Sequence, residues 1–129
     1  MIFGIGSDLV DISRIDKTLK KFGNRFINRC FSENEIKLSK NFNDKASYFA
    51  KKFAAKEAFT KAFGTGISNG VYFKDIEIYN NEYGKPLIKL YGNVKEKYNL
   101  IEKNKNDLSL NLSITDEKYL VHAFVIISN

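Results

Sequence analysis

The stretch from Asp44 to Phe63 limits the fold more than any other part of this 129-residue chain. Alanine occupies every fourth position along it: Ala46, Ala50, Ala54, Ala58 and Ala62. Residues four apart share one face of an α-helix, and a face of small side chains lets another backbone approach closely. Gly64 follows as a C-terminal cap. The sequence therefore predicts one long helix packed tightly against a sheet or another helix.

Shorter elements are expected before this helix. Residues 2–8 read as a short strand that ends at a turn. Asp11 is placed to N-cap a helix that begins at Ile12, and apolar residues at three- and four-residue steps extend the helical pattern to a break near Gly23. The stretch Ser32–Glu35 has the form of a capping box and predicts a further short helix.

The second half of the chain is strand-like. Alternating apolar residues predict three strands, at 74–79, 87–91 and 108–114, and an apolar run predicts a fourth at 119–127. A turn is expected at 80–86 and a polar helix at 94–103. This order of elements predicts a single α+β domain over residues 1–129, with a mainly antiparallel sheet and one long packed helix beside shorter ones.

Composition and charge limit the cellular compartment and the kind of partner that we expect. The chain carries one cysteine, Cys30, which excludes an internal disulfide and fits a reducing cytoplasm. No apolar stretch is long enough to cross a membrane, and the N-terminus does not have the pattern of a signal peptide, so we expect a cytoplasmic protein. The net charge of +6 indicates an anionic partner.

One face of the predicted long helix carries residues that are candidates for chemistry. Phe49, Phe53, Glu57 and Lys61 are four apart and so lie on one face. The simpler interpretation is a surface ion pair of Glu57 with Lys61, worth about 0.3–0.5 kcal/mol. The alternative is a functional pair, because a charged pair that continues an apolar stripe is partly buried and needs a partner or a ligand.

A second carboxylate makes a metal site conceivable. Asp8 ends the first predicted strand, where a turn aspartate is the simpler interpretation. Together, Asp8 and Glu57 would provide the one or two carboxylates that Mg²⁺ takes from proteins that bind phosphate substrates. Residues Gly64, Thr65 and Gly66 offer backbone N–H groups to a phosphate, although such glycines more often only end a helix.

Basic side chains repeat at helical steps on the opposite side of the N-terminal apolar stripe: Arg14, Lys17, Lys21 and Arg25. A solvated helix face is the simpler interpretation of such a charge run. The functional alternative is a docking surface for an acidic partner.

These motifs resemble those of the bacterial holo-acyl-carrier-protein synthases, the short type of the 4′-phosphopantetheinyl transferase superfamily. The stretch Gly4–Ile15 (GIGSDLVDISRI) is similar to their opening motif, and Phe49–Ile67 (FAKKFAAKEAFTKAFGTGI) to their second motif. Gly84–Pro86 resembles their hairpin turn and Ser109–Val125 their closing strands. The resemblance covers nearly the whole chain in order.

The resemblance implies a 4′-phosphopantetheinyl transferase fold and an enzyme. Such an enzyme moves 4′-phosphopantetheine from coenzyme A to a serine of apo acyl carrier protein, releases adenosine 3′,5′-bisphosphate and supports fatty acid biosynthesis. Asp8 and Glu57 match the magnesium ligands of the family, and Lys61 matches a lysine that contacts a coenzyme A phosphate. These three are the expected catalytic residues.

The resemblance also assigns the remaining contacts. Lys52 and Lys56 match basic residues near the nucleotide, and we expect Gly64 and Thr65 at the phosphates. Arg14 matches a residue that docks the acidic carrier protein, and the docking surface is expected to include Lys21 and Arg25 as well. Short members of the family are homotrimers with sites between subunits.

Two other functions compete with the transferase. A nucleic-acid-binding module would fit the charge and the aromatic content, but the chain has no recognisable motif for DNA or RNA, so no nucleic-acid partner is expected. A protein that holds coenzyme A without transfer would share the site but not the reaction.

Overall fold

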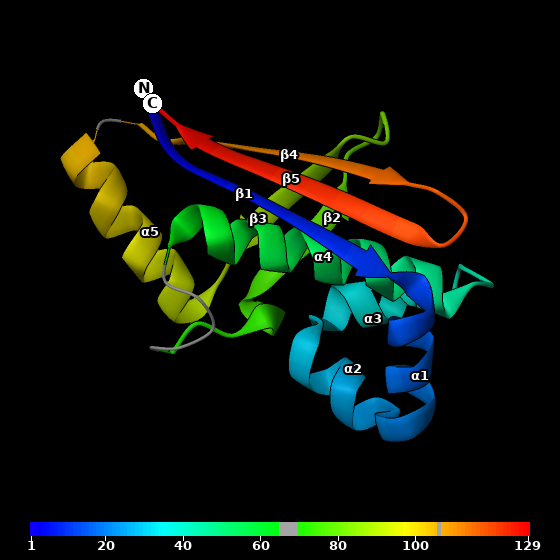
Figure 1. Ribbon diagram of the computed structural model, residues 1–129. Helices are drawn as coiled ribbons and strands as arrows, with labels where there is room; N and C mark the ends of the chain where they lie inside the picture. Colours follow the sequence, from blue (N-terminus) through cyan, green and yellow to red (C-terminus); the bar gives the residue numbers. More distant parts are fainter. Residues whose placement is uncertain (65–69, 106) are drawn as a thin grey trace.

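A three-stranded antiparallel sheet forms the upper layer of the computed structural model, which describes residues 1–64, 70–105 and 107–129 (Figure 1). Strand β5 (Leu120–Ser128) lies in the centre, between β1 (Ile2–Asp11) and β4 (Ser109–Asp116). Strand β1 extends three residues beyond its predicted end, because its polar residues continue the ladder with β5: Asp8 pairs with Ala123 and Asp11 with Leu120.

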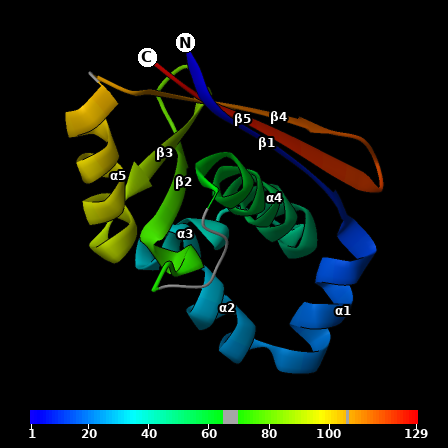
Figure 2. The same ribbon diagram turned by 60° about the vertical axis from the view of Figure 1, so that its left-hand side comes forward.

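Helix α4 (Lys45–Phe63) packs beneath this sheet, as Figure 2 shows end on. Its five ridge alanines are all buried, at 0–9% exposure. Above them lie the inward-facing residues of the central strand: Val121, Ala123, Val125 and Ile127. The predicted tight contact between a small-residue helix face and a sheet is confirmed. Asp44 N-caps α4 through the amide of Ser47, and Gly64 ends it in the left-handed conformation.

Three short helices follow β1 and lie on the side of α4 away from the sheet (Figure 1). Helix α1 (Ile12–Phe22) is capped by Asp11, and Gly23 separates it from α2 (Asn24–Cys30) with a φ of 52°. Helix α3 (Glu33–Ser39) opens with a complete capping box, in which Ser32 and Glu35 bond each other's backbone amides. All three sequence signals for these helices are confirmed.

The remaining strands form a separate two-stranded sheet. Strands β2 (Ile76–Asn80) and β3 (Pro86–Leu90) pair as a hairpin, and helix α5 (Gly92–Lys105) follows. The first of these strands was expected from residue 74, but Phe73–Asp75 forms a 3₁₀ turn (η1) that brings the chain under α4. The α+β class with a long packed helix is confirmed, with its antiparallel strands divided between two sheets.

No helix of the described residues covers the outer face of the large sheet (Figures 1 and 2). Large apolar side chains stand exposed there, including Phe3, Ile5 and Leu9 on β1. The chain termini meet at one end of this sheet, where the amino group of Met1 donates to the carbonyl of Asn129 at 2.9 Å. In the part of the chain that the structure describes, no helix is long and apolar enough to span a bilayer.

Candidate functional site

Strand β1 and helix α4 bring Asp8 and Lys61 together. The ammonium of Lys61 lies 3.1 Å from Asp8 Oδ1 and donates to the carbonyl of Ser7 at 2.9 Å. The Asp8 side chain is 17% exposed, whereas that of Lys61 is 55% exposed. The simpler sequence interpretation paired Lys61 with Glu57, but its ion-pair partner in the structure is the carboxylate of the neighbouring strand.

Glu57 stands one turn before Lys61 and is half-buried. Burial raises the pKa of its carboxyl, the negative charge of Asp8 raises it further, and Lys61 offsets part of the increase. None of the hydrogen bonds or ion pairs found within residues 1–64, 70–105 and 107–129 uses the Glu57 carboxylate. Two carboxylates that repel each other at a half-buried edge are a favourable place for a cation.

The two carboxylates of Asp8 and Glu57 suit Mg²⁺ better than they suit a metal ion whose ligands all come from protein. Across the described ranges there is no cluster of three or more His, Cys, Asp or Glu side chains that could ligate a metal. Mg²⁺ commonly takes one or two carboxylates and completes its shell with water and substrate phosphate oxygens. The pair of Asp8 and Glu57 fits that pattern and would not suffice for a structural zinc.

Glycines on β1 set the distance between these groups. A Cβ atom built on Gly6 would lie 1.9 Å from the carbonyl oxygen of Ala58, and one on Gly4 would lie 1.8 Å from that of Ala62. Neither glycine has a positive φ, so both are needed for space rather than for backbone conformation. The sheet therefore approaches the α4 backbone closely enough for Asp8 to reach Lys61 and for its charge to act on Glu57.

Lys56 differs from the role that the family resemblance implied. Its side chain is 0% exposed, and its ammonium donates to Glu35 Oε1 at 2.7 Å and to the carbonyls of Phe73 and Ile76 at 2.8 and 2.6 Å. Three N–H donors are all that a lysine has. The ammonium therefore has neither the surface nor a donor with which to contact a nucleotide, and we correct its assignment to a buried ion pair.

Lys52 lies one turn earlier and is 7% exposed. Its ammonium donates to the carbonyl of Ile78 at 2.9 Å and stands 4.9 Å from the centre of the Tyr48 ring. One bond leaves two of its donors available. In contrast to Lys56, this side chain borders a cavity.

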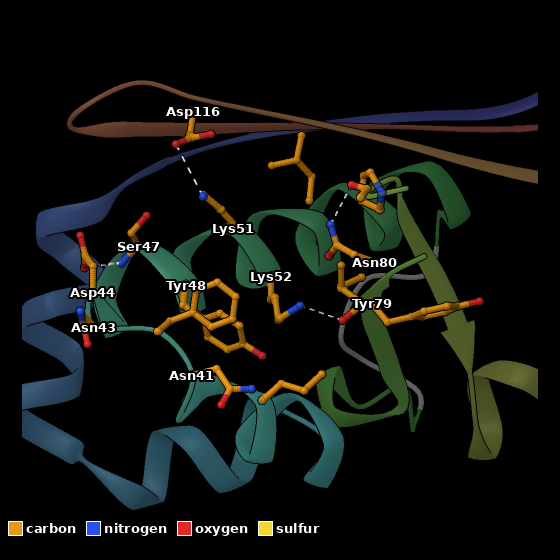
Figure 3. A pocket seen from close by; sticks show the side chains of 16 residues that line it. Asn41, Asn43, Asp44, Ser47, Tyr48, Lys51, Lys52, Tyr79, Asn80 and Asp116 are labelled. Carbon is orange, nitrogen blue, oxygen red and sulfur yellow. Dashed lines mark hydrogen bonds and ion pairs between the residues drawn. The ribbon is translucent and has the colours of Figure 1, made fainter. Parts of the chain in front are cut away.

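That cavity has a volume of about 810 Å³ and lies between α4, β4, the β2–β3 hairpin and the segment before α4 (Figure 3). Lys51 and Lys52 contribute cationic groups, and Tyr48 and Phe42 contribute aromatic rings whose centres lie 4.8 Å apart. Lys51 is 3.7 Å from Asp116 across its rim. The volume falls within the range typical of small-molecule sites. Sequence reasoning missed this cavity because its walls come from four separate segments.

The cavity and the carboxylate pair lie on opposite flanks of α4. Asp116 stands on β4, Asp8 on β1, and β5 separates these two strands. Within one chain the structure therefore does not unite Lys52 with Asp8, Glu57 and Lys61.

Gly64 and Thr65 were both predicted to contact a phosphate. The N–H of Gly64 donates to the carbonyl of Thr60 at 2.9 Å as part of the helix cap, so it is not available to a phosphate. Thr65 lies outside the described residues.

The predicted docking residues are all exposed on the first two helices. Arg14 and Lys21 stand on α1 and Arg25 on α2, beyond the break at Gly23. Lys20, between them, is already paired with Asp16 at 2.9 Å. Helix α1 begins directly after the strand that carries Asp8, so this basic surface continues from the carboxylate pair.

Comparison with known proteins identifies the family. The model of the 4′-phosphopantetheinyl transferase superfamily matches residues 4–120. This chain belongs to that superfamily. The chain is 46% identical over 127 residues to the holo-[acyl-carrier-protein] synthase of Rhizobium meliloti (strain 1021), covering 98% of this chain and 91% of that protein.

Solved structures of the superfamily share the fold. The holo-[acyl-carrier-protein] synthase of Neisseria meningitidis superposes with a TM-score of 0.86 at 40% identity and covers all of both chains. The synthase of Helicobacter pylori, solved in complex with coenzyme A, gives a TM-score of 0.78 at 38% identity over 96% of this chain and 99% of that one. The expected family, fold and enzyme class, a phosphopantetheinyl transferase, are confirmed.

Proposed function

We propose that this protein transfers 4′-phosphopantetheine from coenzyme A to a serine of apo acyl carrier protein in a magnesium-dependent reaction, and that it serves fatty acid biosynthesis in the cytoplasm. One observation carries the proposal: the half-buried pair of Asp8 and Glu57 beside the Lys61 ammonium, in a chain of this superfamily. The coenzyme A complex of the Helicobacter pylori relative supports the donor substrate.

The reaction needs charge neutralisation and alignment more than covalent catalysis. The serine hydroxyl gives its proton to a general base as its oxygen attacks the phosphorus next to pantetheine, and the bond from that phosphorus to the bridging oxygen breaks, so adenosine 3′,5′-bisphosphate leaves. Mg²⁺ held by Asp8 and Glu57 would supply positive charge at the pyrophosphate. Lys61 has one donor left after its bonds to Ser7 and Asp8, and it donates this to a phosphate oxygen.

The nucleotide end of coenzyme A is assigned to the cavity. Aromatic rings of Tyr48 and Phe42 suit a base, and the ammonium groups of Lys51 and Lys52 suit phosphate. Since this cavity and the carboxylate pair lie on opposite flanks of α4, one complete site requires two copies of the chain. This separation supports a homotrimer in which each copy supplies the cavity to one neighbour and the carboxylates to the other.

The uncovered sheet face is the proposed interface between copies. Its exposed apolar residues include Ile5 at 54% and Leu9 at 63%, and half-buried Phe124 and Ile126 lie beside them on β5. Monomeric proteins seldom expose a contiguous apolar patch of this kind without a partner for it. Burial of this face in a trimer would remove the exposed apolar surface from water.

The acidic carrier protein is proposed to dock on the exposed basic residues Arg14, Lys21 and Arg25. Their surface continues from the carboxylate pair, which would bring the carrier serine to the pyrophosphate. Opposite charges at such a surface raise the association rate and fix the orientation.

A transfer assay tests the function. Purified protein is incubated with apo acyl carrier protein, coenzyme A and Mg²⁺, and the carrier is weighed by mass spectrometry. We expect a mass gain of about 340 Da, the mass of the phosphopantetheine group, that disappears with EDTA and returns with added Mg²⁺. Tight coenzyme A binding by calorimetry with an unmodified carrier would refute transfer and favour a protein that only holds coenzyme A.

A further inference from the structure

Side chains, rather than a strand, satisfy the free edge of β2. Among the described residues, this strand pairs with β3 on one side and with no strand on the other. On its other side, Lys56 donates to the carbonyl of Ile76, Lys52 donates to that of Ile78, and the amide of Ile78 donates to Glu35 Oε2 at 3.0 Å. The carbonyls and the amide that would otherwise form a ladder are thus held by α3 and α4.

The groups that hold this edge are buried charges. Glu35 is 1% exposed and Lys56 is 0% exposed. Glu77, on β2 itself, is 5% exposed and accepts from Ser32 Oγ at 2.6 Å and from the Tyr91 hydroxyl at 3.2 Å. Burial lowers the pKa of Lys56, and the negative charge of Glu35 offsets part of that decrease. A buried ion pair of this geometry fixes the relative position of its elements, because any separation leaves a charge unpaired in a poorly solvated interior.

The β2–β3 hairpin, which these side chains hold, forms one wall of the cavity. Tyr79 and Asn80 of β2 and Pro86 of β3 line it. Tyr48 and Lys51 of α4 line the opposite side (Figure 3). The distance between these walls depends on how firmly β2 is held against α4. The large sheet does not hold it through backbone pairing, since the two sheets are separate within the described chain.

We propose that Lys56 and Glu35 are positioning residues for substrate: they hold the hairpin against α4 and so set the affinity of the cavity for the nucleotide end of coenzyme A. Neither residue touches the substrate. This inference rests on the proposed function, which supplies the ligand. It assigns a role to a lysine that the family motif carries but that cannot reach a ligand.

The test removes both charges together. The double variant Lys56→Met/Glu35→Gln keeps similar side-chain volumes and removes both members of the ion pair, so it avoids the unpaired buried charge that either single substitution would leave. We expect KM for coenzyme A to rise about tenfold or more, while kcat at saturation stays within about threefold and KM for the carrier protein is unchanged. Hydrogen exchange at the β2 amides, above all that of Ile78, should accelerate while exchange in β5 stays slow.

A matched control separates positioning from stability. Val125→Ala lies in the centre of the large sheet, fully buried and outside the cavity lining, and should lower Tm without raising KM for coenzyme A. The positioning role is refuted if the double variant, like this control, lowers Tm without raising KM for coenzyme A. It is also refuted if the β2 amides of the double variant stay protected from exchange and KM is unchanged. If the wild-type protein transfers nothing, the proposed function fails, but hydrogen exchange still decides whether the pair holds the hairpin.

Discussion

Replacing Gly6 by alanine tests whether close approach of β1 to α4 builds the site. The added Cβ would lie 1.9 Å from the carbonyl oxygen of Ala58 and 2.6 Å from the amide nitrogen of Ala62. Both colliding atoms are backbone, so no rotamer change relieves the clash. To restore ordinary contact, which begins near 3.4 Å, strand and helix must separate by about 1.5 Å.

This separation of strand and helix should lower both the stability of the fold and the rate of transfer. Overpacking of a tight core contact costs about 1–3 kcal/mol, which corresponds to a fall in Tm of about 5–10 °C for a domain of this length. A displacement of about 1 Å at a site can reduce the rate about 100-fold. Because the separation moves Asp8 away from Glu57 and Lys61, transfer should fall by more than the loss of folded protein explains.

The assay compares Gly6→Ala with Ser7→Ala, measuring Tm by circular dichroism and transfer by mass spectrometry at one protein concentration. Ser7 is exposed on the opposite face of the same strand, within the proposed interface, where alanine adds neither bulk nor charge, and the contact with Lys61 uses the Ser7 backbone carbonyl, which alanine retains. We expect wild-type behaviour from Ser7→Ala. Wild-type Tm and transfer in Gly6→Ala would show that the helix and the strand do not need this distance.

Three further predictions concern the site, the interface and the lone thiol. Glu57→Gln should abolish metal-dependent transfer yet leave Tm at pH 7.5 equal or higher. Folding raises the pKa of this carboxyl, so its ionisation lowers the stability of the folded state as pH rises above the pKa of the unfolded chain, and glutamine removes that cost. A marked fall in Tm would contradict this. If the proposed trimer forms through the uncovered sheet face, Ile5→Lys should yield a monomer in sedimentation and lower transfer at least about tenfold. Tyr83→Lys, at an exposed hairpin tip, should leave the oligomeric state unchanged. A trimer with wild-type transfer in Ile5→Lys would place the interface elsewhere. Burial raises the pKa of the Cys30 thiol, so iodoacetamide should alkylate it slowly at pH 8 and rapidly in urea, and equal rates in both would contradict the observed burial.

Local signals predicted the elements well. Asp11, the Ser32–Glu35 capping box and Gly64 each lie at the helix end that they predicted. These features depend on backbone groups within a few residues, so their physics is contained in a short stretch of sequence. One error arose where the pairing partner is distant: β1 was predicted too short because its polar residues gave no local sign that they pair with β5, which lies more than 100 residues away in the chain. The other, the early start of β2, arose because the 3₁₀ turn at Phe73–Asp75 has no distinctive sequence pattern.

Some site residues could likewise be predicted from the sequence, whereas others depend on packing between elements. The motif in α4 identified Glu57 and Lys61, and their spacing put them on one helix face. It also suggested a nucleotide contact for Lys56, which differs from Lys52 by one helical turn and has the same charge. Only the packing of η1, β2 and α3 against α4 shows that Lys56 is fully buried while Lys52 reaches the cavity.

The sequence by itself determined the long small-faced helix, the glycines of the first strand and the identity of the charged residues, because these are properties of residue type and spacing. Tertiary structure decided which charges meet. It paired Lys61 with Asp8 rather than with Glu57, left the Glu57 carboxylate without a hydrogen bond or ion pair in the described chain, and buried Lys56 against Glu35. Those outcomes depend on distances between elements and on exclusion of water, which no spacing along the chain specifies.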